Sequence, residues 1–189
     1  MDAFASLFSA FGLSASAGLN AYIPLLVVSL TARYTHLITL TSPWDVMTSW
    51  WVIGALVVLI AIEFFADKVP LFNHVNDIVQ TFVRPVAGAV LFASNAGVVS
   101  QIHPILAVIA GLLVAGTVHA AKSAAIRPAV TATTGGTGNI FVSAAEDVLA
   151  TVLSILAVVI PVIIAALIIV LTSLLVWWLW RRSVRMRTA

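Results

Sequence analysis

Residues 119–147 read HAAKSAAIRPAVTATTGGTGNIFVSAAED, and this stretch decides how the rest of the chain is interpreted. It places basic and acidic side chains between two strongly apolar segments, and an Arg-Pro step and a glycine-rich run at 134–138 interrupt it. Polar groups beside irregular backbone at membrane depth usually mark the working part of a membrane protein. The stretch therefore predicts where a functional site lies.

The composition predicts a protein whose main solvent is lipid. Of the 189 residues, 62% are hydrophobic and 8% are charged, and the mean hydropathy is +1.15. Soluble domains carry about 25% charged residues. The absence of cysteine excludes disulfides, thiolate nucleophiles and cysteine metal clusters. We expect an all-α polytopic membrane protein with a single transmembrane domain over residues 1–189.

The apolar runs predict about six transmembrane helices, some of them broken or kinked. Small residues, Asn20 and Pro24 interrupt the first, which is either kinked there or a half-helix joined to a second segment. Pro161 is expected to begin the last span after a tight turn, and a single long helix kinked at Pro161 is the alternative. The predicted spans cover residues 4–32, 50–66, 85–102, 105–121, 139–158 and 161–180.

Residues 71–84, LFNHVNDIVQTFVR, predict an amphipathic helix lying in the membrane interface. Apolar residues recur at helical spacing, and the opposite face carries polar residues that include Gln80 and Arg84. Pro85 suits the first turn of a helix, so the next span is expected to begin there.

The basic residues predict the topology. With six spans, eight of the nine lysines and arginines fall on the side of both termini, and only Arg33 falls opposite. The positive-inside rule makes that side cytoplasmic. We therefore expect a multi-pass protein of the bacterial cytoplasmic (inner) membrane with cytoplasmic N- and C-termini. The cluster of arginines after the last span is a topology signal rather than an indication of nucleic-acid binding.

Short internal similarities indicate a duplicated hairpin, which is common in transporter folds. The Lys68 and Arg84-Pro85 pair resembles Lys122 and Arg127-Pro128, since each lysine follows a span and each Arg-Pro opens the next. Gly18-Leu19-Asn20 similarly resembles Thr137-Gly138-Asn139, and an aromatic residue follows two positions after each asparagine.

One set of polar residues predicts an ion or substrate pathway. Its acids either line a polar cavity as a proton or cation site, or are neutralised by neighbouring basic residues as structural pairs. Its glycine run either offers backbone N–H groups to an anion at a helix start or is a plain linker. The set comprises Glu146, Asp147, Asn139, Gly135, Gly136, Gly138, Asn20 and Tyr22.

A second set predicts an ion-pair cluster on the cytoplasmic side, for which structural pairing is the favoured interpretation. It comprises Glu63, Asp67, Lys68, Arg84, Lys122 and Arg127. We expect no metal site, no cofactor and no catalytic residue. His74 and Asp77 are only two ligands, and His36, His103 and His119 are scattered at expected interfaces.

Several segments resemble the bacterial membrane family labelled domain of unknown function 4126. They are GLNAYIPLL at 18–26, EFFADKVP at 63–70, VRPVAGA at 83–89, HAAKSAAIRP at 119–128 and GNIFVSAAEDV at 138–148. The resemblance covers nearly the whole chain. It implies a multi-span integral membrane protein and transfers no catalytic residue.

The leading hypothesis for function is a small transporter or channel for an ion or small solute, because intramembrane charge coincides with broken helices. The alternative is a structural or assembly factor that packs against other membrane proteins through small-residue faces. A lipid-modifying enzyme comes third. The expected partners are the lipid bilayer, an unknown solute or ion and other copies of the chain.

Overall fold

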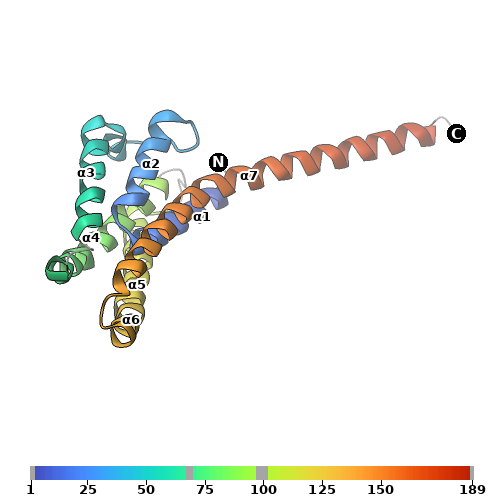
Figure 1. Cartoon of the computed structure of the whole chain (residues 1–189). Coiled ribbons are helices and arrows are strands. Elements are labelled where there is room, and N and C mark those ends of the chain that lie inside the picture. The colour runs from blue at the N-terminus through green and yellow to red at the C-terminus, as the bar shows by residue number, and fades with distance from the viewer. Residues whose placement is uncertain (1–2, 67–69, 97–101, 188–189) are drawn as a thin grey trace.

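The structure is a computed structural model that describes residues 3–66, 70–96 and 102–187. These residues form helices and no β-strand, so the all-α prediction is confirmed. Figure 1 shows the helices α1 (Ala3–Leu19), α2 (Tyr22–Tyr34), α3 (Trp50–Ala66), α4 (Pro70–Ala96), α5 (Pro104–Ala121), α6 (Arg127–Thr134) and α7 (Asn139–Arg187). A 3₁₀-helix η1 (Trp44–Thr48) precedes α3, and a π-helix η2 (Lys122–Ile126) joins α5 to α6.

Helix α1 is the centre of the bundle, since it packs against α4, α5 and α7. Its buried faces consist mainly of alanine, serine and glycine, and small residues of this kind let helices approach closely. Ser14 donates a hydrogen bond to the Gly88 carbonyl of α4 at 2.8 Å, and Ser16 donates to the Ala150 carbonyl of α7 at 2.8 Å. Many of the large apolar side chains of the bundle lie on its outside.

Helices α1, α3 and α5 run toward one end of the bundle, and helices α2, α4 and α7 run away from it. The C-terminal end of α1 meets the C-terminal end of α5, where Lys122 contacts the Leu19 carbonyl. The adjoining Asn20 also contacts Glu63 near the end of α3 and Asp147 near the start of α7. Helices α2 and α4 likewise leave from this region, which is called the network end below (Figure 1).

The predicted break in the first apolar run is confirmed, and it separates two helices. Asn20 and Ala21 lie between α1 and α2. The Asn20 side-chain oxygen accepts hydrogen bonds from the backbone N–H groups of Tyr22 and Ile23 at 3.0 and 3.1 Å. These bonds satisfy donors that every helix start leaves without an intrahelical partner. The asparagine therefore caps α2.

The two helices do not continue in one direction, so the residues predicted as span 4–32 follow the alternative of a first helix joined to a second segment rather than a kinked helix. Trp44, which follows α2, packs on the same apolar cluster as Leu7 and Ala10 from the first half of α1. The start of α1 and the α2–α3 connection thus lie together at the end opposite the network end. Helix α2 turns back because Asn20 ends one helix and caps the next.

The boundary predicted at Pro85 is wrong, because α4 continues through this proline. A proline costs one intrahelical hydrogen bond, which packing of the flanking turns offsets here. At the end of the predicted amphipathic helix the polar residues Gln80 and Arg84 are buried, whereas Ile78 and Phe82 are 66% and 72% exposed. Residues 97–101 of the predicted third span lie outside the described residues.

The tight turn predicted before Pro161 is also absent, because α7 is one helix of 49 residues with Pro161 inside it. This is the single-helix alternative. The apolar sequence on both sides of the proline offers no glycine or asparagine to end the helix. At 1.5 Å per residue, α7 is roughly 74 Å long. Its first half packs on α1, and its second half extends beyond the other helices (Figure 1).

Two helical stretches, Pro104–Thr134 and Asn139–Pro161, are long and apolar enough to cross a membrane. Shorter apolar helices cover Ala5–Leu19, Tyr22–Tyr34 and Trp50–Ala66. The bounds of α3 and α5 coincide within one residue with the helices expected at 50–66 and 105–121.

Candidate functional site

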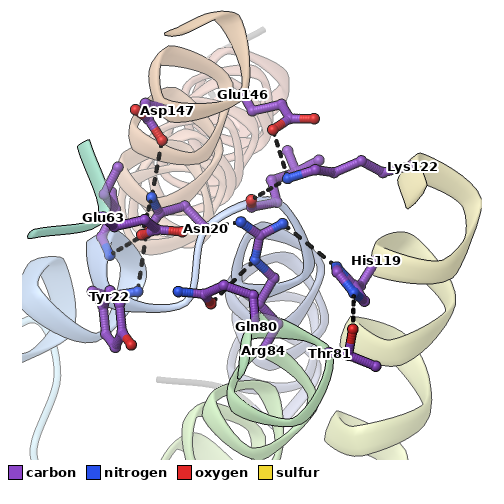
Figure 2. Close-up of polar contacts among 12 residues, drawn as sticks. Asn20, Tyr22, Glu63, Gln80, Thr81, Arg84, His119, Lys122, Glu146 and Asp147 are labelled. Atoms are coloured by element: carbon purple, nitrogen blue, oxygen red, sulfur yellow. Dashed lines mark hydrogen bonds and ion pairs between the residues drawn. The ribbon is translucent and has the colours of Figure 1, made fainter. Parts of the chain in front are cut away.

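A buried group of polar and charged side chains surrounds the break between α1 and α2 (Figure 2). It is called the polar network and comprises Asn20, Glu63, Gln80, Arg84, His119, Lys122, Glu146 and Asp147. All of them except Asp147, which is partly buried, are buried. Helices α3, α4, α5 and α7 and the α1–α2 break each contribute, so the network joins distant parts of the chain.

Asn20 is at the centre of the polar network. Its side-chain nitrogen donates to Glu63 Oε2 at 2.7 Å and to Asp147 Oδ1 at 2.9 Å. The orientation of this amide follows from the backbone, because its oxygen already accepts the N–H groups of Tyr22 and Ile23. One asparagine thereby caps a helix and brings two carboxylates from different helices onto one nitrogen atom.

Arg84 connects α3, α4 and α5. Its guanidinium contacts Glu63 Oε1 at 3.0 Å, Gln80 Oε1 at 3.4 Å and His119 Nδ1 at 3.5 Å. An arginine can only donate, so Nδ1 of His119 acts as the acceptor and the proton of the neutral ring is on Nε2. Nε2 lies 3.2 Å from the Thr81 hydroxyl and donates to it in this tautomer.

Lys122 lies on the other side of the break, at the start of the π-helix. Its ammonium contacts Glu146 Oε2 at 2.5 Å and donates to the Leu19 carbonyl, the last of α1, at 3.1 Å. Arg127 lies 3.6 Å from the same carboxylate oxygen. The second oxygen of Glu146, Oε1, is buried and has no hydrogen-bond partner in the described part of the chain.

The charges of this region balance within the described residues. Its carboxyl groups are those of Glu63, Glu146 and Asp147, and its basic side chains are those of Arg84, Lys122 and Arg127. Burying a single unpaired charge is costly, whereas paired and hydrogen-bonded charges are tolerated. The equal number of acidic and basic groups, paired as they are here, is therefore compatible with their burial.

The sequence profile of the domain of unknown function DUF4126 matches residues 7–182. The chain belongs to this family. No curated protein and no solved structure matches the sequence. Every residue of the polar network lies within the matched range, so the network is part of the DUF4126 domain itself.

In the structure, residues from the predicted pathway and residues from the predicted ion-pair cluster lie in one network. Glu146, Asp147 and Asn20 from the predicted pathway contact Glu63, Arg84 and Lys122 from the predicted ion-pair cluster. Tyr22 follows the break and lies beside the polar network (Figure 2). Asp67 and Lys68 lie outside the described residues.

The glycine run lies elsewhere, between α6 and α7. Gly135 ends α6 in a left-handed conformation with φ 62°, and Gly136 has φ 92°. The N–H groups of Gly138 and Asn139 donate to the Thr134 hydroxyl and the Gly136 carbonyl, at 3.0 and 3.1 Å. These two N–H groups donate within the turn that connects α6 to α7, and the assignment of the run to a pathway stays a prediction.

Sequence reasoning missed Gln80 and His119 as members of the polar network. Gln80 and Arg84 are four residues apart and so share a helix face, which was assigned to the membrane interface. His119 is one of three scattered histidines for which the membrane interface is an ordinary position. The available signal was the polar face of 71–84, but periodicity does not tell whether such a face meets water, headgroups or other helices.

Proposed function

We propose that this DUF4126 protein is an integral membrane protein that moves an ion or small solute along a pathway through the polar network. The observation that carries the proposal is the reversal of polarity in the bundle. Its interior holds buried acidic and basic side chains at a broken helix, whereas α3, α5 and the first half of α7 expose large apolar side chains.

The exposed side chains support a lipid environment. Helix α3 exposes Trp51 and Phe65, and α7 exposes Val148 and Leu149. In water, an apolar surface continuing over several helices would aggregate, whereas a bilayer solvates it. In the first half of α4, Gln80 and Arg84 are buried while Ile78 and Phe82 are exposed, which is the arrangement that lipid rather than water favours.

The helix break supports a transport role. Interrupted helices with unpaired backbone groups are tolerated at membrane depth where they are buried in protein or line a cavity, and in transporters they bind ions or substrates. Here Asn20 at the break holds two carboxylates, Glu63 and Asp147, that come from opposite parts of the chain. A shift of α3 or α7 relative to the break would separate the acids and change their affinity for cations or protons.

The arrangement also leads to a proposal for topology. The α1 start, Arg33 and the end of α7 lie away from the network end, so the termini share a side but Lys122 and Arg127 do not share it. This differs from the predicted grouping of eight basic residues. We place the termini in the cytoplasm of a bacterial cell, because Arg33 and the four C-terminal arginines favour that side.

Reconstitution in liposomes tests the transport proposal. The protein is expected to increase the flux of protons, Na⁺, K⁺ or one member of a panel of small solutes above that of empty vesicles, as read by trapped dyes. The double variant Glu146→Gln with Asp147→Asn should abolish the flux, whereas Phe65→Leu on the exposed face of α3 should retain it. Flux of none of these species, or equal flux in the double variant, would remove the proposal.

A structural or assembly role remains the second candidate because of one observation. The second half of α7 extends beyond the other helices and has none of them beside it (Figure 1). A helix in that position is suited to packing against another membrane protein or another copy of the chain. Isolation of a stoichiometric partner that is lost on deletion of residues 162–187 would favour this function over transport.

A further inference from the structure

The ammonium group of Lys122 occupies a position that resembles a cation site. The α1–α2 break leaves the Leu19 carbonyl at the C-terminal end of α1, where the helix dipole is negative. Unwound carbonyls and half-helix C-terminal ends bind cations in membrane proteins. The Lys122 ammonium lies 3.1 Å from this carbonyl oxygen and 2.5 Å from Glu146 Oε2, and the residue is only 2% exposed.

A second feature of the same position points to a ligand. Glu146 is 6% exposed, and its Oε1 atom has no hydrogen-bond partner among the described residues. A buried carboxylate oxygen without a donor is unfavourable. The Lys122 ammonium contacts Oε2 and leaves Oε1 without a hydrogen bond. A free cation is not attached to a side chain, so it can contact both oxygens of the carboxylate.

We propose that Lys122 acts as a tethered cation in a monovalent-cation site formed by the Leu19 carbonyl and the Glu146 carboxylate. The wild-type protein therefore needs no Na⁺ or K⁺ at this site. Removing the ammonium opens the site to an alkali cation, which restores the charge balance around Glu146. If the protein is a transporter, as proposed above, its transport needs no Na⁺ or K⁺ as a co-ion at this position. The existence of the cation site does not depend on the proposed function.

Thermal unfolding of the purified full chain in detergent tests the site without any flux measurement. Lys122→Ala is compared in NaCl, in KCl and in N-methyl-D-glucamine chloride at equal ionic strength, because the last cation is too large to enter. The midpoint of the variant is expected to rise by roughly 3 to 10 °C in NaCl or KCl. The wild-type midpoint should be the same in all three salts.

Two control variants separate this effect from general screening. Arg127→Gln removes a positive charge from the same carboxylate but leaves Lys122 in place, so it should gain no dependence on the cation. Lys122→Ala combined with Glu146→Gln removes the carboxylate and should lose the dependence. Ethylammonium should stabilise Lys122→Ala, because it supplies a free ammonium of similar size.

The proposal is overturned if Lys122→Ala unfolds at the same temperature in the three salts. It is equally overturned if neither Lys122→Ala nor Lys122→Gln folds in NaCl or KCl, since an ion should then replace the ammonium. Absence of flux in liposomes together with a cation-dependent midpoint would remove the proposed function and leave the site standing.

Discussion

The side-chain amide of Asn20 donates a 2.9 Å hydrogen bond to Asp147, a residue 127 positions later in the chain. The same nitrogen donates to Glu63 at 2.7 Å. The break between α1 and α2 is thereby connected to α3 and α7 through one atom, so a change at Asn20 acts on three parts of the bundle together.

Substitutions of Asn20 can separate its role as a helix cap from its role as a donor. Asn20→Ala removes both and should lower the free energy of unfolding by roughly 2 to 4 kcal/mol. Asn20→Asp keeps an oxygen for the N–H groups of Tyr22 and Ile23 but places a third carboxylate beside Glu63 and Asp147. It should therefore destabilise at least as much as alanine when unfolding is followed by SDS titration in mixed micelles. A clearly milder effect of Asn20→Asp would show that capping is the dominant role.

The contributions of Glu63 and Arg84 to the free energy of unfolding should be strongly coupled. Both residues are buried, and breaking a buried pair by removing one partner typically costs about 3 to 5 kcal/mol, because the other charge stays unpaired. We expect Glu63→Gln and Arg84→Gln each to approach this loss and the double variant to lose much less than their sum. A double-mutant cycle of unfolding free energies measures the difference. Additive effects would mean that the two charges do not depend on each other.

Two glycines provide a matched test of helix packing. A Cβ atom added at Gly18 would lie 2.6 Å from the Ala115 carbonyl oxygen, whereas one added at Gly54 would meet nothing within 4 Å. Gly18→Ala should therefore destabilise by about 1 to 3 kcal/mol as α1 and α5 are pushed apart. Gly54→Ala should stabilise by up to about 1 kcal/mol through helix propensity. Equal effects of the two variants in thermal unfolding would contradict the close approach of α1 to α5.

Cysteine labelling tests the proposed topology directly, because the native chain contains no cysteine. Thr39→Cys lies between α2 and η1, Ser183→Cys lies near the end of α7, and Thr133→Cys lies on exposed α6 at the network end. A membrane-impermeant maleimide should label Thr133→Cys in intact bacteria expressing the protein, and should label the other two only after the membrane is opened.

Labelling of Ser183→Cys and Thr133→Cys from the same side would show that the chain returns at Pro161 in the membrane, as the apolar sequence suggested. Labelling of Thr39→Cys and Thr133→Cys from one side would contradict the arrangement of α1 and α2. The first pair therefore tests whether α7 is one helix, and the second pair tests the arrangement of α1 and α2.

Local signals were sufficient for much of the fold and for the position of the break. Long apolar runs bounded by polar residues defined α3 and α5, and glycine, asparagine and proline near Asn20 indicated an interruption. The chemistry of single residues also selected Glu146 and Asp147 as candidate site residues. Composition and short-range periodicity carry this information, because helix formation depends on neighbours within one or two turns.

Only the tertiary structure decided which groups meet. Asn20 contacts Glu63 and Asp147, which are 43 and 127 positions away, and no local pattern encodes such pairings. The same applies to the polar face of α4 and to the direction of α2, because both depend on which helices lie alongside. The sequence by itself determined an apolar helical protein with a break and buried charges, whereas packing between distant helices decided that the break and the charges form one site.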